Sequence, residues 1–306
     1  MKKVGFVYDD VFLLHKMPDG HPESSARLTA IIAALRQSEL WDKLLHLKSL
    51  KAAPDDIGLV HTPSYIDRIM KFTGYYDPDT YVSSRSVEAA LFAAGSVISA
   101  VDECKAGRIE RAFCAVRPPG HHAEADRAMG FCIFNNVAVG ARHAQKVGYG
   151  KVFIIDFDVH HGNGTQHIFE DDQSVFYFST HQYPHYPGTG RDSERGKGAG
   201  QGFTYNIPMH HGAGDKDYFH AYQDILPGLI LNFDPDIVMV SAGYDLHAGD
   251  PLAGIRVTDE GIKNIVRAIV TSKKGIPYIF CLEGGYNLSS LSASVLITVN
   301  ELLSMD

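Results

Sequence analysis

The chain has 306 residues, of which 45% are hydrophobic and 21% are charged, and its formal net charge is −8 at pH 7. This composition is typical of a globular protein, and the acidic balance disfavours direct nucleic acid binding, which depends on clustered Lys and Arg. No apolar run approaches the roughly 20 residues that span a bilayer, so we expect no membrane partner, and four cysteines without close spacing predict reduced thiols in the cytoplasm.

Strand and helix patterns alternate along the chain. Six short runs of β-branched and aromatic residues predict buried strands, and six segments with helical patterning are interspersed among them. Such alternation predicts an α/β fold with a mostly parallel sheet covered by helices on both faces. No linker, repeat or charge block divides the chain, so we expect a single domain over residues 1–306. The strands are predicted at residues 4–8, 112–116, 152–156, 175–179, 237–241 and 278–282, and the helices at residues 24–36, 87–104, 136–146, 217–231, 259–271 and 288–302.

Polar segments follow the predicted strands at five places. In open α/β sheets, ligands bind outside the carboxyl ends of the strands. Five polar loops that converge on one edge of the sheet therefore predict an active site there. The segments are residues 117–122, 156–164, 179–190, 242–250 and 283–287.

The strongest of these segments begins at the end of a very apolar strand, where Asp156, Asp158 and His160 alternate. A period of two places all three on one face of the chain. Burying two carboxylates and an imidazole is costly unless a cation or hydrogen bonds satisfy them, so we predict a metal site. A catalytic zinc usually takes three protein ligands. The third could be Asp245, which follows a strand as Asp158 does, or a neighbouring acid or histidine of the same loop, Asp250 or His247.

Two further motifs could supply proton transfer and oxyanion stabilisation. His121 and His122 follow a Pro-Pro-Gly turn, where Gly120 permits a sharp change of direction. Beside a metal, one imidazole could accept a proton from water and return it to a leaving amine. Tyr286 follows two glycines, and its phenol could donate to a developing oxyanion. Each feature alone also fits a simpler explanation, exposure for the histidines and packing for the tyrosine.

Five motifs stand in order along the chain: RPPGHHA, GFCIFNN, DFDVHHGNGTQ, SAGYD followed by GDP, and EGGYNL. Together they resemble the zinc-dependent histone deacetylase superfamily, especially its class II and bacterial acetylpolyamine amidohydrolase-like members. The resemblance covers nearly the whole chain, from Gly20 to Tyr286. It implies the arginase-deacetylase fold, a three-layer α/β/α architecture with a central, mostly parallel, eight-stranded sheet.

The resemblance also implies two kinds of metal ion. A catalytic zinc would be held by Asp158, His160 and Asp245, and a set of two carboxylates and one imidazole suits iron(II) as well. A structural potassium ion would lie near five residues at or after two of the predicted strands, partly bound by backbone carbonyls. These residues are Asp156, Asp158, His160, Ser179 and Thr180.

The catalytic roles follow from the same resemblance. Tyr286 would polarise the scissile carbonyl, and His122 would act as general base and then as general acid. His121 would act through charge and hydrogen bonding, oriented by Asp156. Asn163 would stand where class I relatives have a second orienting carboxylate, which leaves His122 with a neutral partner and a lower basicity.

Substrate residues are implied in the same way. Gly130, Phe131 and Tyr186 would line a narrow channel for an acyl-lysine chain, and Leu252 would stand where polyamine-selective relatives can carry an acidic gatekeeper. An apolar gatekeeper favours acetylated lysine in a peptide or protein, with an acetylated polyamine as the alternative. Arg27 would lie under the active site near an acetate exit, and Asp77 and Asp79 could contribute charge to the rim.

Two other classes of protein were compared with these motifs. A binuclear manganese ureohydrolase would need further Asp ligands, but His161 and Asn163 stand at those positions. A reader of acetyl-lysine without enzymatic activity would be expected to lose Tyr286 or His122, and both are present. We therefore predict a metal-dependent deacetylase, whose oligomeric state the motifs do not indicate.

Overall fold

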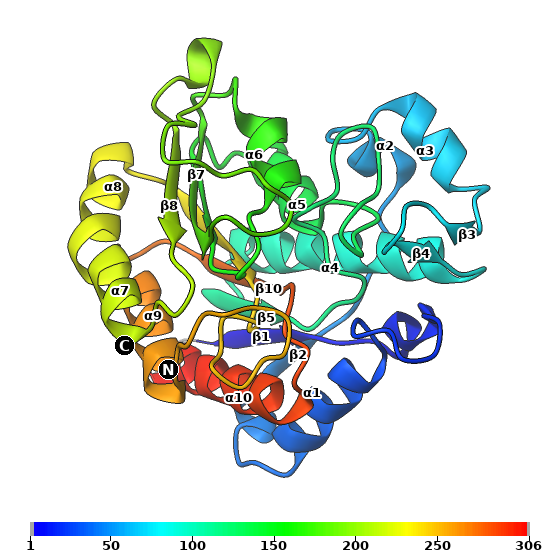
Figure 1. The fold of residues 1–306 in the computed structure, drawn as a ribbon, viewed down its shortest axis with the longest axis horizontal. Helices are drawn as coiled ribbons and strands as arrows, with labels where there is room; N and C mark the ends of the chain where they lie inside the picture. The colour runs from blue at the N-terminus through cyan, green and yellow to red at the C-terminus, as the bar shows by residue number, and fades with distance from the viewer. Residues whose placement is uncertain (1–2, 305–306) are drawn as a thin grey trace.

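The central feature of the protein, described for residues 3–304 in a computed structural model, is a sheet of eight strands (Figure 1). Every pair of neighbouring strands in this sheet is parallel. The predicted eight-stranded parallel sheet is thereby confirmed. From one edge to the other, the strands are β2 (Leu45–Leu47), β1 (Val4–Val7), β5 (Arg111–Cys114), β10 (Tyr278–Leu282), β9 (Ile237–Ala242), β6 (Val152–Asp156), β7 (Val175–Gln182) and β8 (Thr204–Met209).

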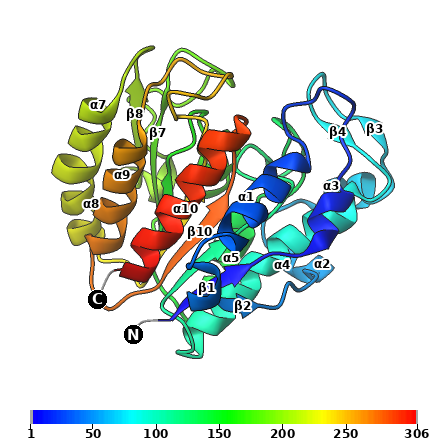
Figure 2. The ribbon, with the colours of Figure 1, turned by 90° about the horizontal axis from the view of Figure 1, so that it is seen from below.

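Helices cover the sheet in two layers, as the alternation of strands and helices predicts (Figure 2). In one layer α10 packs against α1 and α9, and in the other α4 packs against α5. The first layer contains α1 (Ala26–Arg36), α7 (Asp215–Phe219), α8 (Leu226–Phe233), α9 (Asp259–Thr271) and α10 (Leu288–Ser304), and the second contains α4 (Ser86–Lys105), α5 (Asn136–Lys146) and α6 (Asn163–Phe169).

Smaller elements lie outside these layers. They are two short helices, α2 (Pro54–Ile57) and α3 (Pro63–Ile69), an antiparallel pair, β3 (Gly74–Tyr75) and β4 (Tyr81–Val82), and three 3₁₀ turns, η1 (Asp10–Leu14), η2 (Trp41–Lys43) and η3 (Gly198–Gly200). None of the helices in residues 3–304 is both long enough and apolar enough to cross a membrane.

One predicted helix has a different form. The segment predicted as a single helix at residues 217–231 is divided into α7, a π-helix η4 (His220–Ile225) and α8. Pro227 stands in the first turn of α8, and a proline has no backbone N–H to donate to the preceding turn. The α-helical hydrogen-bond pattern therefore changes just before this residue, and the wider π-turn precedes it.

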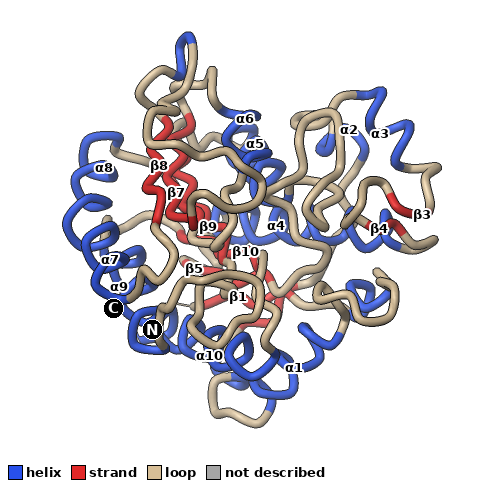
Figure 3. Tube along the Cα trace, in the orientation of Figure 1, coloured by secondary structure: helices blue, strands red, loops and turns tan. Residues whose placement is uncertain are grey.

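The inner strands place the site at one edge of the sheet. Every residue of β5, β6, β9 and β10 is buried, which is expected for strands covered by helices on both faces. Their carboxyl ends lie together because the strands are parallel neighbours. Long loops continue from these ends, and Figure 3 shows those that lead from β5 to α5 and from β9 to α9.

Candidate active site

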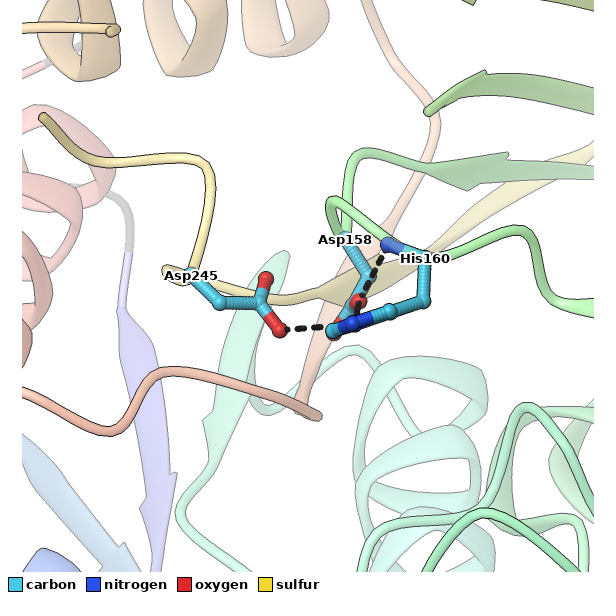
Figure 4. Close-up of side chains that lie close together, drawn as sticks. All are labelled: Asp158, His160 and Asp245. Carbon is cyan, nitrogen blue, oxygen red and sulfur yellow. Dashed lines mark hydrogen bonds and ion pairs between the residues drawn. The ribbon is translucent and has the colours of Figure 1, made fainter. Parts of the chain in front are cut away.

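Asp158, His160 and Asp245 form a cluster whose ligand atoms all lie within 4.8 Å of one another (Figure 4). The first two residues come from the loop after β6 and the third from the loop after β9. His160 Nδ1 lies 3.1 Å from Asp158 Oδ1 and 3.1 Å from Asp245 Oδ2. The two strand ends are adjacent in the sheet, which explains how residues far apart in the sequence meet.

Backbone amides hold the two carboxylates of this cluster in place. Gly284 N donates to Asp158 Oδ2 at 2.8 Å, and Val159 N donates to Asp245 Oδ1 at 3.0 Å. Burial lowers the pKa of His160, but hydrogen bonds and charge from the two carboxylates outweigh burial and raise this pKa to about 10. The site therefore favours positive charge, and its two carboxylates and one imidazole fit a divalent cation.

The two alternatives for a third ligand have other partners. Asp250 accepts hydrogen bonds from the backbone of Tyr286 at 2.6 Å and of Leu252 at 3.1 Å. His247 Nε2 lies 3.1 Å from Asp259 Oδ1. Neither belongs to the cluster of ligand atoms within the described residues, so the geometry favours Asp245.

His121 and His122 lie side by side in the loop after β5, with ring centroids 4.0 Å apart. His121 Nδ1 donates to Asp156 Oδ2 at 3.0 Å. Burial lowers the pKa of His121, but the charges of Asp156 and Asp158 outweigh it and raise the pKa to about 10. Gly120 contributes through close approach rather than an unusual backbone angle, because an added Cβ would lie 2.5 Å from the backbone nitrogen of Asn136.

The second histidine of the pair has an amide partner. His122 Nδ1 lies 2.7 Å from Asn163 Oδ1 at the first turn of α6. Burial, followed by repulsion from His121 and His160, lowers the pKa of His122 well below its ordinary value. The ring is therefore neutral near pH 7 and can accept a proton.

Tyr286 lies in the loop after β10 and keeps its proton. Burial and the nearby Asp245 carboxylate raise the pKa of its phenol well above the ordinary value. The Arg27 guanidinium stacks over its ring at 5.0 Å from the centroid. Arg27 also donates to the backbone oxygens of Glu283 and Gly285, at 2.5 Å and 2.6 Å. This arginine, predicted under the site, therefore supports the loop that carries the tyrosine.

A cavity of about 260 Å³ opens onto these groups. Its walls combine catalytic candidates with the four residues predicted for the substrate channel. The rings of Tyr186 and His122 pack edge to face with centroids 5.1 Å apart, and those of Phe131 and Tyr286 do so with centroids 6.0 Å apart. The lining residues are Asp79, Pro119, His121, His122, Gly130, Phe131, His160, His185, Tyr186, Leu252, Gly284 and Tyr286.

The two acids near the predicted rim differ in position. Asp79 lines the cavity. Asp77 instead accepts hydrogen bonds from the backbone nitrogens of Asp79 and Thr80, at 3.1 Å and 2.6 Å. Asp77 therefore shapes the turn, and Asp79 is the acid that can contact a molecule in the cavity.

Comparison with known proteins decides the family to which this site belongs. The family model described as "Histone deacetylase domain" matches residues 21–302. The chain belongs to the histone deacetylase family.

Members of this family resemble the chain over nearly its full length. "Histone deacetylase 14, chloroplastic" of Arabidopsis thaliana is 41% identical over 94% of this chain and 74% of its own length. "Polyamine deacetylase HDAC10" of Homo sapiens is 39% identical over 95% of this chain and 46% of its own length. The crystal structure of the HDA15 HD domain superposes with a TM-score of 0.95 at 38% identity, covering 99% of this chain and 88% of that one. The arginase-deacetylase fold and the hydrolase class are thereby confirmed.

Three residues of this histone deacetylase family site were not assigned a role from the sequence. Glu124 is buried and contacts Asn163, and His185 stacks on His160 with ring centroids 5.1 Å apart. Glu283 accepts hydrogen bonds from the backbone nitrogens of Gly120 and His121, at 2.6 Å and 3.2 Å. Glu283 begins the motif EGGYNL and Glu124 directly follows RPPGHHA, but the histidines and tyrosine of these motifs gave the more direct chemical interpretation.

Proposed function

We propose that the protein is a zinc-dependent deacetylase that hydrolyses the acetyl amide of a lysine side chain in a peptide or protein. The observation that carries this proposal is the cluster of Asp158, His160 and Asp245, which meets the cavity at His160, beside His122 and Tyr286 in the cavity wall. Zinc or iron(II) held by the three ligands would supply a Lewis acid that polarises the amide carbonyl and acidifies water. We further propose that residues 1–306 act as a single catalytic domain.

The residues of the chain then divide the remaining chemistry among them. His122 Nε2 takes the proton of the attacking water and later returns it to the leaving amine. Tyr286 donates its phenolic proton in a hydrogen bond to the carbonyl oxygen as that oxygen gains charge. His121, held by Asp156 at 3.0 Å, adds positive charge on the same wall of the cavity.

The walls of the cavity support an acyl-lysine substrate. Phe131 and Tyr186 are aromatic and Leu252 is aliphatic, so together they suit the methylene stem of lysine better than a charged chain. An acetylated polyamine is the second candidate, because Asp79 in the cavity wall could accept a hydrogen bond from an ammonium group. The resemblance to a relative named polyamine deacetylase supports the same alternative.

Other conditions for activity are part of this proposal. We place a potassium ion near Asp156 and Ser179, which are register partners on β6 and β7. The hydroxyls of Ser179 and Thr180 are engaged by His181 and Tyr222, so backbone carbonyls would supply further ligands. Cytoplasmic location is supported by four cysteines that are all buried and unpaired.

The test is an acetate-release assay on purified protein loaded with one equivalent of zinc or iron(II), with acetyl-lysine peptides, acetylputrescine and acetylspermidine as substrates. We expect the peptides to have the highest kcat/KM. His122→Ala should lower kcat by about 10²- to 10⁴-fold and Tyr286→Phe by about 10²- to 10³-fold, both with metal retained. Tyr75→Phe, at a tyrosine that is 59% exposed, is the matched control and should have no effect.

Three outcomes would change this interpretation. Wild-type protein that releases acetate from none of these amides with either metal would contradict the proposal. Two tightly bound metal ions per chain would favour a ureohydrolase instead. Equal activity in buffers with and without potassium would show that the protein does not need this ion for activity.

A further inference from the structure

Glu124 is a buried carboxylate that lies two residues beyond His122 and is in contact with its amide partner. Only 6% of the residue is exposed. Glu124 Oε1 accepts a hydrogen bond from Asn163 Nδ2 at 2.6 Å, and the oxygen of the same amide, Asn163 Oδ1, lies 2.7 Å from His122 Nδ1. A continuous path therefore runs from the carboxylate through the amide to the imidazole.

The chemistry of the three groups fixes the direction of both hydrogen bonds. An ionised carboxylate has only acceptor atoms, whereas an amide has one donor end and one acceptor end. Glu124 therefore attracts the NH₂ end of Asn163, and the amide oxygen must face His122. A nitrogen that faces this oxygen must carry a hydrogen, so the neutral ring is protonated at Nδ1 and its Nε2 has a free lone pair.

We propose that Glu124 is a positioning residue, which orients the Asn163 amide and so sets the tautomer that His122 needs as a base. This inference rests on the proposed function, because it assigns His122 the role of proton acceptor. An aspartate in place of Asn163 would need no such help, since both of its oxygens are acceptors. The amide has one donor end and one acceptor end, so a neighbouring group must determine which of them faces His122.

The surroundings of Glu124 suit this role because they hold its carboxylate in one place. Its backbone nitrogen donates to Arg127 O at 3.0 Å, and its backbone oxygen accepts from His61 Nδ1 at 2.9 Å. Its carboxylate also receives a hydrogen bond from His167 Nδ1 at 2.9 Å. The carboxylate is therefore fixed independently of the amide that it orients.

Two weaker contacts favour the same orientation of the amide. Asn163 Nδ2 lies 3.4 Å from the backbone oxygen of His122 and 3.3 Å from the sulfur of Met129. Thioether sulfur is a weak acceptor, and the 3.4 Å contact is longer than the usual range for an N–H···O bond. Glu124, at 2.6 Å, is therefore the strongest of the three acceptors, so its removal should loosen the amide rather than reverse it completely.

Four variants of the zinc-loaded protein test this role by steady-state kinetics. E124M removes the acceptor and keeps the length of the side chain, whereas E124Q keeps an oxygen that can accept from the amide. The wrong imidazole tautomer costs about 10⁴-fold in kcat in serine proteases. Because the loosened amide still samples the productive orientation, we expect a smaller fall of about 10- to 100-fold in E124M with KM nearly unchanged, and near wild-type kcat in E124Q.

The double variant E124M/N163D separates orientation from folding. The carboxylate introduced by N163D has two acceptor oxygens, so it should restore the tautomer and raise kcat at least about fivefold above E124M. Glu170→Met is the matched control, because it removes a carboxylate that pairs with Lys197 on the surface, and it should have wild-type kcat. A double variant no more active than E124M, or E124M with wild-type kcat, would overturn the proposal.

Imidazole ¹⁵N NMR of the wild-type zinc protein gives a test that needs no variant of Glu124. The signals of His122, assigned by their loss in His122→Ala, should show a proton on Nδ1 and none on Nε2. A ring protonated at Nε2 would contradict the proposal even if E124M fails to fold. Failure of the proposed function would instead appear as an inactive wild-type protein, whatever the tautomer of His122.

Discussion

At the level of single residues, Gly130 determines how closely the loop after β5 can approach the ring of His122. Its backbone has a φ of +56°, and an added Cβ would lie 2.4 Å from His122 Cδ2. A carbon this close cannot be accommodated without moving one of the two groups. Either movement changes how the ring of His122 lies in the cavity wall, because both residues line the cavity.

We therefore expect Gly130→Ala to lower kcat by about 10- to 100-fold, since displacement of a catalytic group by about 1 Å can cost that much. Gly107→Ala is the matched control, because Gly107 has a φ of +69° and open space around its Cβ position. Both substitutions should lower the free energy of unfolding by about 1–2 kcal/mol through the left-handed backbone. Activity assays measure kcat of both variants, and urea denaturation measures their free energies of unfolding. An equal loss of kcat in both would mean that backbone strain, and not contact with His122, causes the effect.

Single residues also show where sequence reasoning reached its limit. Asp158 and His160 could be predicted as metal ligands because a buried strand ends directly before them. Asp245 could not be separated from its neighbours by spacing alone, since which acid of a loop turns inward depends on tertiary contacts. Glu124 was missed because its partner Asn163 lies 39 residues further along the chain, at the start of α6, and contact between them exists only after folding.

At the level of elements, Asp250 links the loop after β9, to which it belongs, with the loop after β10. Its Oδ2 accepts from the backbone nitrogens of Tyr286 and Asn287, at 2.6 Å and 3.1 Å, and its Oδ1 accepts from the nitrogen of Leu252 at 3.1 Å. One carboxylate thus holds the backbone of two residues that line the cavity, Tyr286 and Leu252. The relative position of these two loops depends on it.

Asp250→Ala should lower kcat by about 10-fold or more while the metal content stays constant, because Tyr286 would lose the support of its backbone. Loss of the acceptor should also destabilise the protein by about 1–3 kcal/mol, the usual cost of unsatisfied buried donors. Asp259→Ala, at an aspartate of α9 whose side chain is 61% exposed, is the control. The metal content of each variant should be measured together with its kcat. Loss of metal in parallel with activity would mean that Asp250 supports the metal ligands and not Tyr286.

Elements differ in how well the sequence predicts them. The six predicted strands are inner or near-inner strands with continuous apolar runs, and all are present. The edge strands β2 and β8 were not predicted, because β2 is mostly exposed and β8 alternates and contains Pro208. Such strands are defined by pairing with a neighbour rather than by their own composition. The total of eight strands came from the family resemblance.

At the level of the whole molecule, His61 joins the turn before α3 to the loop that carries His121 and His122. It is 1% exposed, donates from Nδ1 to Glu124 O at 2.9 Å and accepts at Nε2 from Asn135 N at 3.0 Å. Burial lowers its pKa to about 4, although hydrogen bonds to backbone oppose this. The folded protein therefore requires the neutral ring.

The free energy of unfolding should consequently decrease as the pH falls from 6.5 to 4. In this window the unfolded chain binds a proton at His61 and the folded chain does not, so the loss approaches about 3 kcal/mol from this residue. Urea denaturation of wild type and His61→Gln at several pH values measures this change in the free energy of unfolding. The stability difference between them should shrink toward pH 4, and a constant difference would show that His61 does not titrate in this way.

The backbone contacts of the ligand carboxylates have a further consequence, which concerns entropy. Gly284 N and Val159 N restrict the side chains of Asp158 and Asp245, which would otherwise rotate freely. The entropic cost of arranging these groups is therefore met when the chain folds, and little of it is left for the moment when metal or substrate arrives. The backbone amides of a glycine and a valine therefore contribute to the affinity of the site, although the side chains of these two residues are not ligands.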